Sequence, residues 1–114
     1  MRLYTNEVAK VCHAVNGALR EFHGEDARPV WDETSALVQE GVMSGIEKLN
    51  ANPHLTPEDM HSAWCMYYGA RGWKYGKTLS DTKKTHPNLV AYDKLPAEQK
   101  LEDVVFHAIV KSLR

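Results

Sequence analysis

The chain has 114 residues, with 14 Lys or Arg and 15 Asp or Glu, so its formal net charge is -1 at pH 7. This length suits one domain, since compact domains commonly contain about 100–150 residues. The charge balance disfavours a basic nucleic-acid coat protein, and the 43% hydrophobic content is ordinary for a soluble globular fold. No apolar segment approaches the ~20 residues of a membrane helix, and the first residues carry no secretory hydrophobic region. We therefore expect a cytoplasmic domain with reduced cysteines.

The first expected helix lies within residues 5–24. Its apolar residues fall at offsets of 0, 3, 4, 7, 11 and 14, which is the spacing of one helical face. Thr5 or Asn6 can cap its start, and Gly24 can end it. The apolar stripe consists of Val8, Val11, Cys12, Val15, Leu19 and Phe22.

A second helix is expected from about Asp32 to Leu49, after a turn-like segment that contains Pro29. Two glycines four residues apart, Gly41 and Gly45, lie on or beside its apolar stripe. They either allow a close approach to a neighbouring helix or are a tolerated weakness of about 1 kcal/mol each relative to Ala. The stripe consists of Val38, Val42, Ile46 and Leu49.

The rest of the chain predicts two more helices separated by an irregular segment. Thr56 can cap a third helix, with Pro57 in its first position, that runs to about Ala70. Residues 71–93 have no helical period, so short strands or extended arms are expected at 73–75 and 89–92. A last helix opens after Leu95-Pro96. Its apolar stripe consists of Leu101, Val104, Val105, Ala108 and Ile109.

These elements predict a mainly α-helical single domain of four helices, with an irregular or short β arm between helices three and four. Helices one, two and four should supply most of the core. Trp64 and Trp73 should join the third helix to the arm.

Positive charge is concentrated in the arm. Residues 71–86 contain five cations and one anion, Asp81, so this segment carries +4 and the remainder -5. Cations beside Trp73 and Tyr75 can attract phosphate and offer a ring for stacking a planar group. A solvated basic loop explains the same pattern, and no long nucleic acid is expected because the whole domain is not basic. The five cations are Arg71, Lys74, Lys77, Lys83 and Lys84.

A second candidate feature is the helix face shared by His61, Trp64 and Tyr68. Either these side chains pack in the core, with His61 bonded to the backbone, or they form the floor of a ligand cleft beside the basic segment. Two readings are also open for Trp73 and His86. They can lock the arm onto the helices, or they can contact a ligand.

Known catalytic and metal-binding motifs are absent from the sequence. No two of its six histidines stand three or four residues apart, and there is no CxxC, HExxH, GxSxG or complete phosphate-binding loop. Cys12 and Cys65 fall on apolar helix faces, where free cysteines are commonly buried. The sequence therefore predicts a protein that is not an enzyme and needs no metal or cofactor.

Several motifs follow one another in the second half of the chain. They are His61-x-x-Trp64, Gly72-Trp73-Lys74-Tyr75-Gly76, Asp81, Lys84-Thr85-His86-Pro87, Leu89-Val90 and Tyr92-Asp93-Lys94-Leu95-Pro96. Together they resemble the ryanodine receptor repeat (RyR) domain over residues 56–113. Residues 1–50 resemble the helical extension of stand-alone prokaryotic and phage members. Asn88 and Ala91 depart from the pattern, which often has a small residue or Cys at the first position and Pro at the second.

The resemblance implies a non-catalytic binding module that recognises a small phosphorylated or nucleotide-like ligand. In this expectation Trp64 or Trp73 stacks on a planar group while cations meet the phosphates. Family repeats usually occur in tandem pairs, so a single copy can pair by forming a homodimer. The alternative is a protein-interaction or dimerisation module with no small-molecule ligand. The expected ligand-binding residues are His61, Trp64, Tyr68, Arg71, Trp73, Lys74, Tyr75, Lys77, Lys83, Lys84 and His86.

Overall fold

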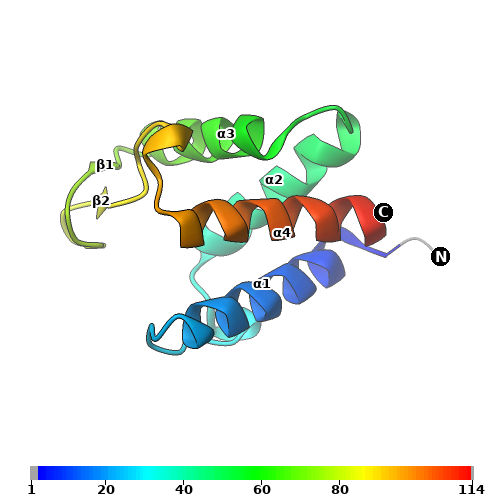
Figure 1. Cartoon of the computed structure of the whole chain (residues 1–114), viewed down its shortest axis with the longest axis horizontal. Coiled ribbons are helices and arrows are strands. Elements are labelled where there is room, and N and C mark those ends of the chain that lie inside the picture. Colours follow the sequence, from blue (N-terminus) through cyan, green and yellow to red (C-terminus); the bar gives the residue numbers. More distant parts are fainter. Residues whose placement is uncertain (1–2, 114) are drawn as a thin grey trace.

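The computed structural model describes residues 3–113, which form four α-helices, two short 3-10 helices and a two-stranded sheet. The helices are α1 (Thr5–Phe22), α2 (Ala36–Ala51), α3 (Pro57–Gly69) and α4 (Ala97–Leu113). The sheet lies in the arm between α3 and α4, which confirms the expected mainly α-helical architecture. Figure 1 shows the arm projecting from one end of the helical body, with both chain ends at the opposite end.

Helix α2 begins four residues later than the sequence predicted. Asp32 lies in a 3-10 helix, η1 (Trp31–Glu33), and the backbone is extended at Ser35. Ser35 then caps α2, because its hydroxyl accepts a hydrogen bond from the Val38 amide at 3.3 Å. The predicted start was wrong because a short 3-10 turn and an α-helix cannot be separated by apolar spacing.

The other helix ends mostly follow the expected signals. Thr56 caps α3 by accepting a hydrogen bond from the Asp59 amide at 3.1 Å, and Asp59 accepts one from the Thr56 amide at 2.9 Å. Gly24 follows α1 with a φ of +89°, a conformation that glycine adopts without strain. Neither Thr5 nor Asn6 caps α1, since that helix already begins at Thr5 and Tyr4 precedes it.

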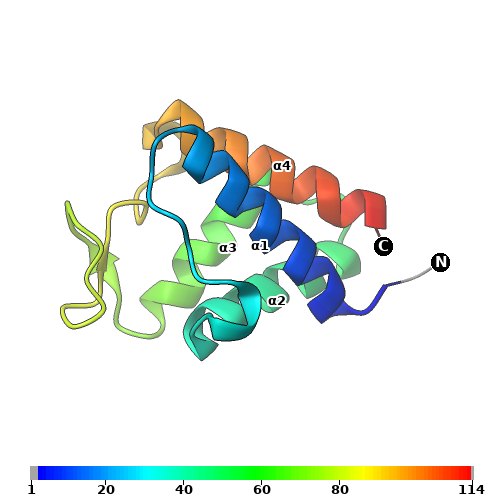
Figure 2. The same cartoon turned by 90° about the horizontal axis from the view of Figure 1, so that it is seen from below.

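The core lies among α1, α2 and α4, as expected. Figure 2 shows α1 crossing the molecule between α4 and α2. The stripe predicted for α2 is confirmed, because Ile46 and Leu49 are fully buried and Val38 and Val42 are half-buried. The buried core residues are Val8, Ala9, Cys12, Trp31, Ile46, Leu49, Met60 and Val110.

The predicted buried face of α4 is confirmed only in part, because Val105 and Ile109 are half-buried and Ile109 packs against the core, whereas the other three residues of the stripe are exposed. Leu101 and Val104 are 42% and 47% exposed, and Ala108 is also exposed. The helix instead buries Glu102 and Val110. Helix α4 contacts α1, α2 and α3 at once, so its rotation is decided by three neighbours and by polar partners for Glu102. The apolar stripe of a single helix sequence does not show which neighbours the helix will contact, so it cannot predict this rotation.

Two residues of the α1 stripe are also exposed rather than buried. Val11 is 39% exposed and Phe22, in the last turn of the helix, is 86% exposed. Val8 and Cys12 are buried as predicted. Phe22 has little to pack on because the chain turns away at Gly24.

The two glycines of α2 lie where side chains of other helices approach closely. A Cβ atom on Gly41 would meet Tyr67 Cε2 at 3.0 Å, and one on Gly45 would meet Met60 Cε at 3.6 Å. Of the two alternatives left open by the sequence, close helix packing explains Gly41, whereas the ordinary contact distance at Gly45 fits a tolerated weakness of the helix.

In the arm, β1 (Lys74–Tyr75) pairs in parallel with β2 (Thr85–His86). Of the two segments expected as short strands or extended arms, 73–75 contains a strand, whereas 89–92 contains none and has extended backbone at Ala91. Tyr92 instead opens a 3-10 helix, η2 (Tyr92–Lys94). Gly76 permits the strands to approach, because a Cβ atom there would lie 2.6 Å from Thr85 Cβ.

Candidate functional site

Aromatic rings from α3 and the arm pack into one group, here called the aromatic cluster: His61, Trp64, Tyr68, Trp73 and His86. The Trp64 ring stacks on His61 with centroids 5.7 Å apart, and its centroid lies 4.6 Å from that of Tyr68. Tyr68 meets Trp73 edge-on at 5.3 Å, and Trp64 meets His86 edge-on at 4.9 Å. The structure thus brings together five of the residues that the sequence analysis selected.

Within this cluster His61 is bonded to the backbone. Its side chain is buried, and its Nε2–H donates to the Val90 carbonyl at 2.7 Å. His13 and His107 make similar bonds, to the carbonyls of Pro29 at 2.6 Å and Leu55 at 2.7 Å. These three histidines each tie a helix to a loop, so His61 has the role of a backbone-bonded core residue.

The two indole rings differ in their exposure to solvent. Trp73 is only 9% exposed, whereas Trp64 is half-buried beneath its neighbouring rings. Both rings connect α3 to the arm, as expected. Tyr75, at 54% exposed, is the aromatic side chain of the arm that faces solvent most fully.

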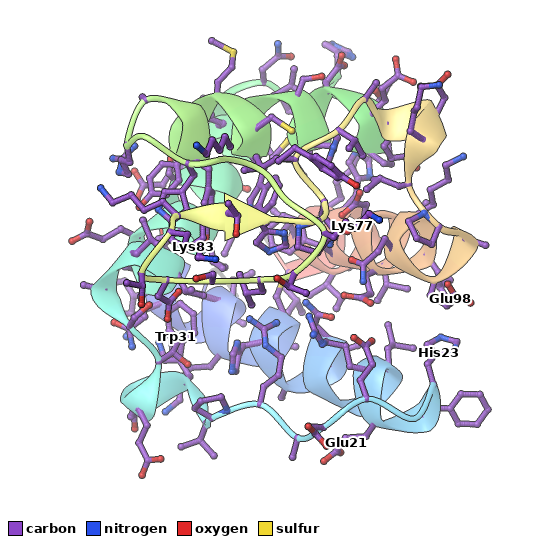
Figure 3. All side chains as sticks on the ribbon, turned by 90° about the vertical axis from the view of Figure 1, so that its left-hand side faces the viewer. Glu21, His23, Trp31, Lys77, Lys83 and Glu98 are labelled. Carbon is purple, nitrogen blue, oxygen red and sulfur yellow. The ribbon has the colours of Figure 1, made fainter. Side chains whose placement is uncertain are left out.

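The cations of the arm fall into two groups. Arg71 lies over the Tyr67 ring at 3.6 Å and donates to the Tyr67 carbonyl at 2.8 Å. Lys84 Nζ donates to the Arg71 carbonyl at 3.2 Å. Lys77 and Lys83 are exposed and lie on either side of β2 at the end of the molecule (Figure 3). Lys74 is exposed as well.

Two arginines from another part of the chain approach this end of the aromatic cluster. Arg20 stands in the last turn of α1 and Arg28 in the loop that follows. The pKa of His86 is lowered from 6.5 to about 4, first by burial and then by the positive charges of Arg20 and Arg28. The sequence analysis missed both arginines. The sequence shows two cations near the end of the first helix. It does not show which other part of the fold lies against that end.

A buried carboxyl group lies beside these arginines. Burial raises the pKa of Glu102 from 4.5 to about 7, although Arg20 and Arg28 favour its charged form. With the Asn16 amide turned to suit its neighbours, its nitrogen donates to Glu102 Oε1 at 2.5 Å and its oxygen accepts from Arg28 Nη1 at 3.2 Å. Arg20 pairs with Glu25 at 3.1 Å. Arg20 Nε and Glu102 Oε2 are buried without a hydrogen-bond partner among residues 3–113.

The adjacent carboxyl group, that of Asp103, faces the aromatic cluster. Its Oδ2 lies 4.0 Å from His61 Nδ1, and burial raises its pKa from 3.8 to about 7. His61 uses Nε2–H for Val90, so Nδ1 is the ring nitrogen that faces the Asp103 carboxyl group. The end of α4 thus places two carboxyl groups of raised pKa beneath the arm.

Residues 3–113 hold no group of three His, Cys, Asp or Glu side chains suited to a metal ion. None of the helices in this range combines the length and apolarity needed to cross a bilayer. An open hollow on α2, lined by residues that include Glu40, Met43 and Glu47, is built from that helix alone and adds nothing to the aromatic cluster.

Comparison with known families agrees with the motifs of the second half of the chain. The model of the RyR domain matches residues 32–113. The match includes the last two residues of η1 and the whole of α2, so it begins well before the motif region at residue 56. Arg20 and Arg28 precede it, whereas His86 and Glu102 lie within it. Because the match spans well over half of its length, this chain belongs to the RyR domain family.

Proposed function

We propose that this protein is a non-catalytic binding module for a small phosphorylated or nucleotide-like ligand. The observation that supports the proposal is the charge of +4 on the arm, whose exposed lysines lie beside the aromatic cluster, and Arg20 and Arg28 add positive charge that acts on His86. Cations from two separate segments create a positive field around a half-buried imidazole. A phosphate group there gains charge-assisted hydrogen bonds, which are about twice as strong as neutral ones.

The exposure of each side chain suggests its role in this proposal. Lys77 and Lys83 at the rim would meet the phosphates, and the planar group would stack on Tyr75 or on the open part of Trp64. Trp73 would support the arm, because it is buried. Stacking contributes ~1–3 kcal/mol per base, whereas micromolar affinity needs about 8 kcal/mol, so cation–phosphate contacts must supply most of the difference.

Isothermal titration calorimetry with three probes tests this function. Adenosine diphosphate and pyrophosphate should bind, and adenosine should bind at least about 10-fold more weakly, because the phosphates provide most of the contacts. Affinity for both phosphates should fall as salt is added. If neither adenosine diphosphate nor pyrophosphate binds, the proposal is refuted. That result would favour an interaction module without a small-molecule ligand.

A pair of matched variants assigns the site. Lys77→Gln/Lys83→Gln removes two exposed cations from the arm, and Lys48→Gln/Lys111→Gln removes two exposed cations from α2 and α4. The arm variant should bind pyrophosphate at least about 10-fold more weakly with an unchanged melting temperature. Equal affinity in the two variants would show that the arm does not hold the phosphate.

A further inference from the structure

The end of the molecule that carries the arm is divided by charge. One half is the basic arm, residues 71–86, with a charge of +4. The other half is residues 21–33, here called the acidic segment, with five carboxylates against Arg28 and a charge of -4. Figure 3 looks directly onto this end, with Lys77 and Lys83 on one side and Glu21 across from them. The carboxylates are Glu21, Glu25, Asp26, Asp32 and Glu33, all on exposed residues, of which Glu25 pairs with Arg20 at 3.1 Å and Asp32 with Lys10 at 3.9 Å.

Each half also exposes two large apolar side chains. Phe22 and Val30 in the acidic segment are 86% and 64% exposed, and Tyr75 and Leu79 in the basic arm are 54% and 59% exposed. A single exposed apolar residue needs no explanation. Apolar side chains surrounded by charged groups on both halves of one face have the composition of a protein interface, with an apolar centre and a polar rim.

The partition of charge makes this face complementary to itself. In an isologous dimer the same patch of both copies meets across a two-fold axis. A two-fold axis through the middle of the end face places the basic arm of each copy on the acidic segment of the other. The molecule is 27 × 26 Å across its long axis, and a standard interface covers ~800 Å² per partner, so such a dimer covers most of this end.

We infer that a second copy of this chain docks on the end face, with basic arm against acidic segment in both directions. Complementary potentials orient the two copies and discourage other arrangements. The two apolar pairs, Phe22 with Val30 and Tyr75 with Leu79, meet across the interface and exclude water. The dimer covers the arm, so a phosphate ligand and the carboxylates of the second copy compete for the same cations.

Charge reversal tests this arrangement with the full chain. Lys77→Glu/Lys83→Glu brings the charge of the basic arm from +4 to 0, and Glu21→Lys/Asp26→Lys brings that of the acidic segment from -4 to 0. Each variant alone should sediment near the monomer mass of 12.9 kDa, because neither contact of its homodimer still joins opposite net charges. An equimolar mixture should form a heterodimer of twice that mass, in which the unchanged basic arm of one variant meets the unchanged acidic segment of the other. Wild type should dimerise at low salt and dissociate as salt is added.

The control is Lys48→Glu/Lys111→Glu, which changes the net charge by the same amount on other exposed surfaces and should dimerise like wild type. Circular dichroism melts should show that all variants fold. A wild-type chain that stays monomeric at low salt and high concentration would overturn the inference. So would a mixture of the two reversed variants that forms no heterodimer, or a dimer that neither reversal weakens.

Discussion

The Glu102→Gln variant tests whether this buried side chain of α4 is a neutral carboxyl group or an ionised partner of the arginines in the folded chain. Glu102 is 7% exposed, and burial raises its pKa from 4.5 to about 7. Gln has nearly the same shape and no charge. It can keep the contact with Asn16, since both amides can rotate to pair.

The difference in stability between the two proteins should depend on pH. Between pH 4.5 and about 7 the folded chain holds a proton on Glu102 that the unfolded chain has released. The free energy of unfolding of the wild type therefore falls as pH rises through this window. Above about pH 7 the free energy of unfolding falls no further. At about 1.4 kcal/mol per pH unit, the total decrease is at most about 3 kcal/mol. The Gln variant has no such loss.

Urea denaturation followed by circular dichroism between pH 4.5 and pH 8 measures this difference. Glu102→Gln should match the wild type at the acidic end and be more stable at pH 8 by up to about 3 kcal/mol, or about 10 °C in melting temperature. Asp103 and His86 titrate in both proteins, so their contributions largely cancel. Glu98→Gln, an exposed change on the same helix, should give a difference that does not vary with pH.

A Glu102→Gln variant that is less stable than the wild type at pH 8 would refute this reasoning. It would mean that Glu102 is ionised in the folded chain and compensates Arg28, because removal of one partner of a buried ion pair commonly costs about 3–5 kcal/mol.

Three further predictions concern packing. Gly45→Ala should stabilise α2 by up to about 1 kcal/mol, because the added Cβ meets nothing closer than 3.6 Å. Gly76→Ala should lower the melting temperature instead, because the added Cβ would lie 2.6 Å from Thr85 Cβ. Trp73→Ala should cost about 3–5 kcal/mol in urea denaturation, and a loss below about 1 kcal/mol would show that the indole does not anchor the arm. Burial raises the pKa of Cys12 to about 12, so iodoacetamide should modify it at pH 8 only after unfolding, and prompt labelling of the folded chain would contradict its burial.

The helices could be predicted because their signals are local. The Thr56-Pro57 start and the Gly24 stop act within one or two turns, and they place α3 and the end of α1 correctly. The start of α2 was placed too early because Asp32 lies in a 3-10 turn whose side-chain spacing resembles that of a helix. Local patterns therefore located the elements to within a few residues.

The candidate site could be predicted only in part. His61, Trp64 and Tyr68 share a face of α3, and their spacing alone placed them together. That spacing could not show which reading was correct, and the bond from His61 to the Val90 carbonyl favours a core role for that side chain. The chemistry of a site depends on partners that are distant along the chain.

The sequence by itself determined the four helices, the irregular arm and its excess of positive charge, because these follow from neighbouring residues. Only the tertiary structure decided that Arg20 and Arg28 approach His86, and that α4 buries Glu102 instead of Leu101. The rotation of α4 and the arginines that face it depend on each other through long-range packing. No periodicity within one helix contains that information.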